Sequence, residues 1–264
     1  MKIWFCPNGF TSEQNMQALE CMKTLEQFGH RISVSLEDRE RLSLDESYAS
    51  FIAKESDLIV SLGGDGSVLR AAKVAIASQK PLFGINSGRL GYLCSMNYSE
   101  IEKFDEVLSE SICIDRDLLE CVYEDRKCFA VNDLVIAKKN FGETVDLMIR
   151  IDEEQPFNVR GDGIILATPT GSSAYNLSSG GAVLDPESET VVITPICPHA
   201  SHAYPIVLNN KRQVGVSERN DQAQIYADGN FIGNLSGELS IYKSSRVLSL
   251  YTGCGAVNSI IRFS

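Results

Sequence analysis

Apolar residues follow two repeat lengths in the first part of the chain. Lys2 to Cys6 reads as a strand, and apolar residues recur at helical spacing from Met16 to Phe28. A buried apolar run at Asp57 to Leu62 leads through a glycine-rich corner into a helix that ends near Gln79, and Pro81 to Asn86 reads as the next strand. This alternation predicts an α/β domain with a Rossmann-like parallel sheet, whose ligands bind beyond the carboxyl ends of the strands.

Further elements are expected between and after these. Thr11 and Gln14 have the spacing of a capping box, in which each residue satisfies a backbone N–H of the other. Arg31 to Leu36 alternates like a strand, and the pattern predicts helices over Leu44 to Lys54 and over Ser99 to Ser111.

Beyond about Asp115 the pattern changes to short β-rich runs separated by Gly, Asn, Asp and Pro, which is typical of an all-β domain, either sandwich-like or a multi-strand sheet. The expected strands are Val131 to Ala137, Val145 to Ile151, Ile164 to Ala167, Val191 to Ile196, Ile206 to Leu208, Gln213 to Val216, Ala223 to Tyr226 and Leu239 to Tyr242. We therefore expect an α/β domain over residues 1–114, completed by the tail 246–264, and a β-rich domain over 115–245.

The net charge, the apolar runs and the cysteine pattern limit which binding partners and which cellular environment are expected. The formal net charge of −11 gives no basic field for a polyanion, which argues against binding to nucleic acid or to an anionic membrane. No secretory leader or run of about 18 apolar residues is visible, and the eight cysteines show no C-x-x-C pair. Buried free thiols in a reducing cytoplasm are the expected state.

The glycine-rich corner Gly63-Gly64-Asp65-Gly66 is the first candidate site. Glycine lets backbone N–H groups approach a ligand, and Ser67 is expected to cap the helix whose positive end favours phosphate. Because a carboxylate repels phosphate, Asp65 would act through Mg²⁺, as a proton acceptor from a sugar hydroxyl, or on a ribose. The alternative is a turn aspartate in a plain strand-to-helix connection.

A second candidate is the segment 160–181, RGDGIILATPTGSSAYNLSSGG, where hydroxyl and small residues form a polar wall that a flat ring can approach. Its alternative is a Ser-rich loop with an oversupplied N-cap, and for Asp162 a β-turn aspartate. The Asn132-Asp133 pair can hold both edges of a ribose or simply form a turn, and His199 is a proton shuttle or a structural histidine.

In this order, the motifs GGDGS, GINSGRLGYL, ND, TPTGSSAYNLSSGG, TPICPH and YADGN resemble those of the NAD kinase family, from Leu58 to about Asn230. That family transfers a phosphoryl group from ATP, or in some members polyphosphate, to the adenosine 2′-hydroxyl of NAD. The GGDG motif alone is weak evidence for this family because lipid kinases share it. The TPTGSSAYNLSSGG stretch is the motif that distinguishes NAD kinases from lipid kinases.

The resemblance implies a role for each matching position. Asp65 corresponds to the catalytic base, Mg²⁺ is expected on the donor phosphates rather than in a protein cage, and the assembly would be a homodimer or homotetramer. The implied substrate-binding residues are Asp65, Gly66, Arg70, Asn132, Asp133, Arg160, Asp162, Thr170, Ser173, Ala174, Tyr175, Ser178 and Asn230. Asp133 departs from the family's usual glutamate and is one methylene shorter.

Three other functions remain open from the residues. A lipid kinase would use the same GGDG turn but needs an apolar entrance, and a non-catalytic nucleotide-binding protein would use Asp65 only as a turn residue. A nicotinamide dehydrogenase is disfavoured because GGDGS is not G-x-G-x-x-G and the first strand carries no such turn.

Overall fold

The chain folds into two compact units. The computed structural model describes residues 1–9, 11–88, 91–199, 203–218 and 221–252. One unit holds Met1–Arg116 with the chain from Leu248 on, and the other holds Asp117–Val247. The observed boundaries at 117 and 248 each lie two residues after the expected 115 and 246. The end of the expected tail, residues 253–264, lies outside the described residues.

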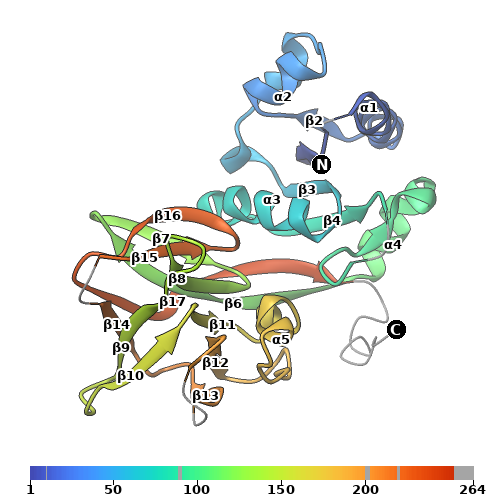
Figure 1. The fold of residues 1–264 in the computed structure, drawn as a ribbon. Helices are drawn as coiled ribbons and strands as arrows, with labels where there is room; N and C mark the ends of the chain where they lie inside the picture. Colours follow the sequence, from blue (N-terminus) through green and yellow to red (C-terminus); the bar gives the residue numbers. More distant parts are fainter. Residues whose placement is uncertain (10, 89–90, 200–202, 219–220, 253–264) are drawn as a thin grey trace. The chain divides into compact units, whose positions relative to one another are not determined.

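The first unit is built on a parallel sheet in the order β4-β3-β1-β2, with β5 beside β4, so the expected α/β fold is confirmed (Figure 1). Its strands are β1 (Lys2–Pro7), β2 (Arg31–Ser33), β3 (Leu58–Gly63), β4 (Leu82–Asn86) and β5 (Met96–Asn97). The chain leaves β1 toward β2 on one side and returns to β3 on the other, so β1 and β3 flank a topological switch point, where ligands of such sheets bind.

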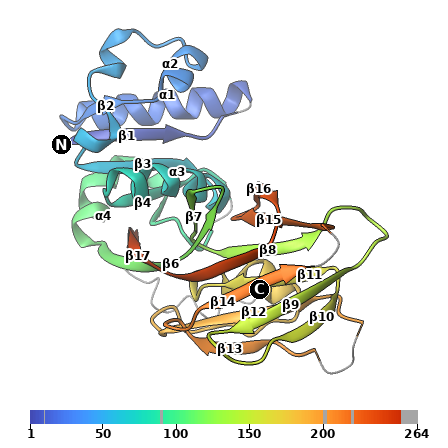
Figure 2. The same ribbon diagram turned by 90° about the vertical axis from the view of Figure 1, so that its left-hand side faces the viewer.

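Helices cover this sheet with apolar faces. The helix α1 (Ser12–Gln27) begins with the expected Thr11–Gln14 capping box and buries Ala18, Cys21, Met22 and Leu25, the i, i+3, i+4, i+7 pattern of one helix face. It lies along β1, as Figure 2 shows, and packs on Ile3, Phe5 and Leu58. The helix α3 (Asp65–Ser78) contacts β3 and β4. The other helical segments are α2 (Leu36–Arg41), η1 (Glu46–Ala49), η2 (Ala53–Glu55), η3 (Tyr98–Lys103) and α4 (Phe104–Glu110).

Two helix predictions in this unit are wrong. In place of a helix over Leu44 to Lys54 the chain forms the 3-10 turns η1 and η2, because Asp45 accepts the Ser47 N–H at 2.8 Å and the backbone at Ile52 is extended. The helix over Ser99 to Ser111 is likewise split between η3 and α4. The strand from Arg31 ends at Ser33, since Ser35 caps α2 through the Asp38 N–H at 3.1 Å.

The second unit is an antiparallel β-sandwich, so the expected β-rich domain is confirmed. One sheet has the order β13-β12-β11-β8-β15-β16, and the other pairs β10-β9-β14-β17. The bounds are β6 (Ile112–Tyr123), β7 (Arg126–Ala130), β8 (Asp133–Lys138), β9 (Val145–Ile151), β10 (Phe157–Gly161), β11 (Gly163–Ala167), η4 (Thr170–Ser173), α5 (Tyr175–Ser178), β12 (Thr190–Ile196), β13 (Ile206–Asn209), β14 (Val214–Glu218), β15 (Ala223–Ala227), β16 (Asn230–Asn234) and β17 (Glu238–Thr252).

The core of this unit lies between the two sheets. Its cluster joins Leu147 and Val216 from one sheet to Leu134, Leu166 and Ile225 from the other, each at most 1% exposed. The alternating burial of β9, in which every second residue is buried, is the period that places one strand face on a core. The strands β6, β7, β10 and β16 were not predicted, and the expected strand at Leu239 continues as the single 15-residue β17.

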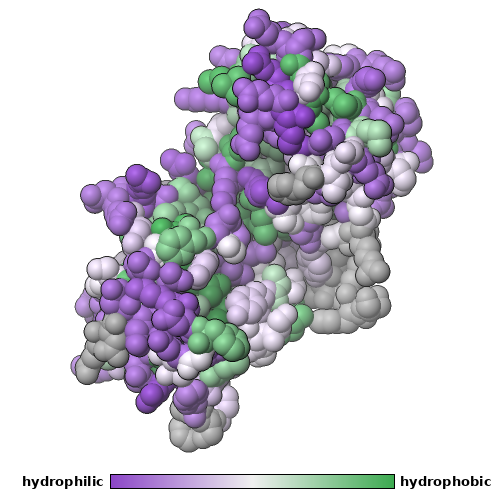
Figure 3. Space-filling view, turned by 45° about the horizontal axis from the view of Figure 1, so that its top comes forward, coloured by the Kyte–Doolittle hydropathy of each residue, from purple (hydrophilic) through white to green (hydrophobic). Residues whose placement is uncertain are grey.

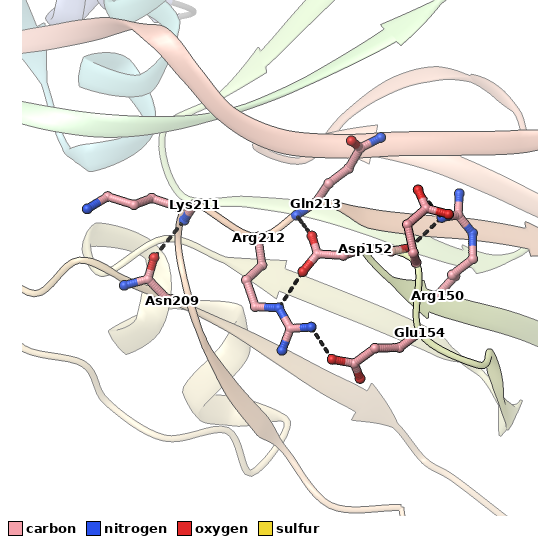
Figure 4. A network of polar contacts seen from close by, with 8 residues as sticks. Arg150, Asp152, Glu154, Asn209, Lys211, Arg212 and Gln213 are labelled. Atoms are coloured by element: carbon pink, nitrogen blue, oxygen red, sulfur yellow. Dashed lines mark hydrogen bonds and ion pairs between the residues drawn. The ribbon is translucent and has the colours of Figure 1, made fainter.

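Charged side chains join two turns of the sandwich (Figure 4). Arg212 donates to the Asp152 carboxylate at 2.6 Å and also to Glu154, while the Gln213 N–H donates to Asp152 at 2.8 Å. These hydrogen bonds, led by the Gln213 N–H, hold the pKa of Asp152 below its usual range. The network fixes the start of β14 against the end of β9.

The surface is mainly polar on the face that Figure 3 presents, where hydrophobic side chains occur in small groups between hydrophilic ones. Within the described part of the chain, no helix combines the length and the apolar character needed to cross a bilayer.

Candidate functional site

The candidate site of the first unit is the corner between β3 and α3. Every residue of β3 is buried, and its last residue, Gly63, has φ 141°. A Cβ at Gly63 would fall 2.2 Å from the Ser67 hydroxyl, so only glycine fits there. The expected cap at Ser67 is wrong: Gly64 is the N-cap, and Ser67 lies inside the first turn, where it accepts a hydrogen bond from Arg70 at 2.9 Å.

The Asp65 carboxylate is held in a fixed orientation. Asp65 opens α3, and its two oxygens accept the backbone N–H groups of Tyr92 at 2.8 Å and Leu93 at 3.0 Å, in the loop after β4. The close approach requires a glycine at 91, where a Cβ would lie 2.1 Å from an Asp65 oxygen. A carboxylate oxygen has room for more than one donor, so Asp65 remains able to accept a proton from a bound hydroxyl.

A cation stands beside this corner. Arg70 donates to the Asn8 side chain at 2.8 Å as well as to Ser67, which joins α3 to the residue that follows β1. Both contacts lie at the carboxyl ends of β1 and β3, the switch point of the sheet. Gly66 is exposed in the first turn of α3. Arg89, the cation in the motif GINSGRLGYL, lies outside the described residues.

The candidate surface of the second unit begins with the segment Val131–Asp133, which leads into β8. The Asp228 carboxylate, in the turn between β15 and β16, accepts all three backbone N–H groups of this segment: Val131 at 2.9 Å, Asn132 at 2.7 Å and Asp133 at 3.2 Å. Asp228 thus sets the backbone that presents the Asn132 and Asp133 side chains. The motif YADGN contains Asp228, but only the fold reveals this partner.

Asp133 is a buried carboxyl group, 5% exposed. Burial and, second, the negative charge of Asp228 raise the pKa of Asp133 to about 7. At neutral pH a large fraction of this side chain is therefore a neutral acid, which can donate a hydrogen bond as well as accept one. An ionised carboxylate would offer acceptors alone.

The hydroxyl-rich segment packs directly on this turn. The Thr168 hydroxyl donates to the Val131 carbonyl at 2.6 Å and accepts the Gly171 N–H at 3.1 Å. A Cβ at Gly171 would lie 2.1 Å from the Asn132 carbonyl oxygen. The structure thus brings Asn132 and Asp133 together with the segment that starts at Thr170, as one surface of the sandwich unit.

Asn176 holds the segment in shape from inside. Its side-chain amide donates to the carbonyls of Ser172 at 2.8 Å and Ala182 at 2.9 Å and accepts from Thr194 on β12 at 2.6 Å. Sequence reasoning missed Asn176, which is fully buried and unavailable to a ligand. Of the expected wall residues, Tyr175 and Ser178 are exposed, and Thr170, Ser173 and Ala174 are half-buried.

The remaining predicted residues lie elsewhere on the same unit. Asp162, between β10 and β11, pairs with Lys138 at 2.7 Å, and the exposed Arg160 is 3.9 Å from Asp146. Asn230 opens β16 and donates to the carbonyl of Asp228 at 2.9 Å, next to the turn that holds residues 131–133. His199 is exposed, and its N–H donates to the Arg160 carbonyl at 2.9 Å.

Dedicated metal ligands are not gathered in the described ranges: no group of three or more His, Cys, Asp or Glu side chains could hold a metal ion there. The functional groups that the two units present differ. One unit has the oriented carboxylate of Asp65 at a glycine-rich corner, and the other has a surface of backbone and hydroxyl groups with the buried acid Asp133.

Comparisons with known proteins cover both units. The profile of the ATP-NAD kinase N-terminal domain matches residues 8–114, which include Asp65. The profile of the ATP-NAD kinase C-terminal domain matches residues 131–252, which include Asn132, the hydroxyl-rich segment and Asn230.

Curated relatives and solved structures agree with these profiles. An NAD kinase of Caldicellulosiruptor bescii is 37% identical over 188 residues, 70% of this chain and 72% of the relative, and one of Thiobacillus denitrificans is 34% identical over 245 residues, 87% and 84%. The crystal structure of yeast NADH kinase complexed with NADH has a TM-score of 0.85 at 24% identity, covering 100% of this chain and 88% of that one. An Archaeoglobus fulgidus NAD kinase in complex with ATP has a TM-score of 0.76 at 24% identity, covering 97% and 95%.

Proposed function

This chain belongs to the NAD kinase family and is therefore a phosphotransferase, and we propose that it transfers the γ-phosphoryl group of ATP to the adenosine 2′-hydroxyl of NAD, giving NADP. Asp65 accepts the proton of the 2′-hydroxyl. The freed oxygen forms a bond to the γ-phosphorus while the bond from that phosphorus to the β-phosphate oxygen breaks, and ADP leaves.

The observation that carries the proposal is the orientation of Asp65. A general base acts only when it is correctly positioned, whatever its proton affinity. The backbone N–H groups of Tyr92 and Leu93, which belong to the same unit as Asp65, hold its carboxylate in a fixed orientation. Because a lipid kinase and a NAD kinase share the GGDG corner, the acceptor is chosen by the other unit, which holds most of the residues 131–252 that match the C-terminal domain of the family.

The second unit supplies the binding surface in this proposal. The backbone groups around Asn132, Asp133 and Gly171 and the half-buried hydroxyls of Thr170 and Ser173 would hold the nucleoside parts of NAD. The exposed Tyr175 ring offers a face on which a base can stack. Arg160, Asp162, Ser178 and Asn230 are proposed at the edge of this surface.

Mg²⁺ is proposed on the donor phosphates. Such phosphates are ordinary ligands of Mg²⁺, which keeps several waters and takes few protein carboxylates. When bound, it would neutralise charge that develops on the transferring group. The chain's net charge of −11 makes such neutralisation more necessary. Within the protein, Arg70 beside the glycine corner is the cation proposed to face a phosphate.

The test is the formation of NADP by the purified protein. NAD and Mg²⁺ are supplied with ATP or with polyphosphate, NADH replaces NAD in a parallel series, and NADP or NADPH is read in a coupled assay. If the protein binds NAD but forms no NADP with either donor, the kinase function is rejected and a non-catalytic nucleotide-binding function is favoured.

The base assignment is tested by Asp65→Asn. We expect kcat to fall by about two orders of magnitude or more with little change in the Kd of NAD, since the amide keeps the size of the side chain but cannot accept the proton, and its NH2 group can no longer accept one of the two backbone N–H groups. Asp45→Asn is the matched control, because asparagine caps η1 as well as aspartate does. Near-normal turnover of Asp65→Asn would reject Asp65 as the base. The homodimer or homotetramer and the cytoplasmic location stay predictions.

A further inference from the structure

Two cysteines face each other on the hairpin that leads into the Asn132 turn. The hairpin pairs β6 with β7, and its register places Cys121 directly opposite Cys128. Both are free thiols in the described structure. Directly opposed residues of antiparallel strands have Cα atoms about 4.5 to 5.5 Å apart, inside the range of about 4.4 to 6.8 Å that a disulfide spans.

We propose that Cys121 and Cys128 are a redox-responsive pair whose cross-strand disulfide weakens NAD binding by moving the adjacent Asn132–Asp133 turn. The inference rests on the proposed function for its activity readout. The pair itself follows from the strand register and from the shared face of the two side chains.

The two thiols have different access. Cys121 is 0% exposed within the core of the sandwich unit, whereas Cys128 is half-buried and packs against that core. An oxidant therefore reaches Cys128 first. Burial raises the pKa of Cys128, and the neighbouring Cys121 thiol opposes this rise. Burial raises the pKa of Cys121 to about 12.

With a peroxide as the two-electron oxidant the reaction balances in two steps. The Cys128 thiolate attacks a peroxide oxygen, so that an S–O bond forms, the O–O bond breaks and, for hydrogen peroxide, water leaves after protonation. Cys121 then attacks this sulfur, the S–S bond forms, and the oxygen leaves as a second water. The two thiols supply two electrons to the peroxide.

Closure changes the spacing of the two strands. Opposed Cβ atoms in an antiparallel pair are about 4.5 to 5.5 Å apart, whereas those of a disulfide are about 3.8 Å apart, so oxidation draws the strands together by about 1 Å. Cys128 lies four residues before Asn132. A shift of about 1 Å in a binding residue is enough to change activity strongly.

A second contact carries the shift to the same turn. Tyr123, two residues from Cys121, lies so close to β16 that a Cβ at Gly233 would fall 2.3 Å from its ring. The hairpin therefore rests on the β15–β16 pair, whose turn contains Asp228, the acceptor for the N–H groups of residues 131–133. Both ends of the hairpin act on one piece of backbone.

The experiment oxidises the full-length protein with hydrogen peroxide or diamide, maps disulfides by mass spectrometry of unreduced peptides, and measures the KM and Kd for NAD. We expect a Cys121–Cys128 disulfide and a KM for NAD that rises about tenfold on oxidation, with a rise of about threefold as the smallest that supports the inference. Dithiothreitol should restore the KM of the reduced protein. The rate of oxidation should rise about tenfold per pH unit near neutrality, because the thiolate is the reacting form.

Cys128→Ser should leave the KM for NAD of the reduced protein within about twofold of wild type and should abolish the rise in KM on oxidation. Cys197→Ser removes an exposed cysteine of the same unit and should retain that rise. A map without the Cys121–Cys128 bond, or the bond with an unchanged KM and Kd, would overturn the inference. Failure of the proposed function is distinguishable, since a protein inactive when fully reduced still reports the disulfide in the peptide map.

Discussion

The buried acid Asp133 should make the free energy of unfolding depend on pH. Asp133 is 5% exposed, and burial together with the charge of Asp228 raises its pKa to about 7. In the unfolded chain an aspartate has a pKa of about 3.9. Between these values the unfolded chain releases the proton while the folded protein keeps it, so the folded state becomes less stable as the pH rises through this window.

The size of the effect follows from the two pKa values. A difference of about three pH units corresponds to about 4 kcal/mol of lost stability above pH 7. Roughly 1.5 kcal/mol of this is lost by pH 5, which leaves about 2.5 kcal/mol between pH 5 and pH 8.

Asp133→Asn removes the titration and keeps the side chain's size. As the pH rises from 5 to 8, the free energy of unfolding of this variant should increase by about 2 to 3 kcal/mol relative to that of the wild type. Urea unfolding without nucleotide, followed by circular dichroism at several pH values, measures the gain. The control is Asp185→Asn in an exposed turn, where asparagine still accepts the Glu187 N–H. A stability difference that does not change with pH would refute the reasoning.

Two further substitutions test the packing behind the binding surface. Gly171→Ala should cost about 1 to 3 kcal/mol and raise the KM for NAD, because the new methyl group meets the Asn132 carbonyl oxygen at 2.1 Å and backbone must move; wild-type stability and KM would contradict this. Asn176→Ala should cost about 2 to 4 kcal/mol in urea unfolding, since three hydrogen bonds are lost and two of the partners, the Ser172 carbonyl and the Thr194 hydroxyl, stay buried; a cost below about 0.5 kcal/mol would show that the partners find other donors and acceptors.

Local signals in the sequence identified much of the fold. The capping box of Thr11 and Gln14 depends on residues three apart, and the glycine corner is a strand end followed at once by a helix start, so neither needs long-range information. The same holds for the alternating strand β9. These elements were predicted because the interactions that define them lie within a few residues.

The wrong predictions arise where local alternatives compete. At Asp45 a side chain that accepts the Ser47 N–H favours a short turn over the helix that the apolar spacing suggested. At Ser67 the hydroxyl suited a cap, but the helix starts earlier: Gly64 is the N-cap and Asp65 is the first helical residue. The β6–β7 hairpin escaped notice because its turn residues Glu124 and Asp125 both have positive φ without the glycine that usually announces such a turn.

The positioning residues of the site could not be predicted for a different reason. Asp228 holds the N–H groups of residues 131–133 although it is 95 residues away along the chain, and the contact exists only because β15 pairs with β8 in the sheet. A ligand-facing side chain carries a chemical signal, such as a hydroxyl or a carboxylate beside glycine. A residue that acts on another residue's backbone carries no such signal until the strand order is known. The charge of Asp228 that fixes this turn also raises the proton affinity of Asp133, so the geometry of the surface and its response to pH have a common origin.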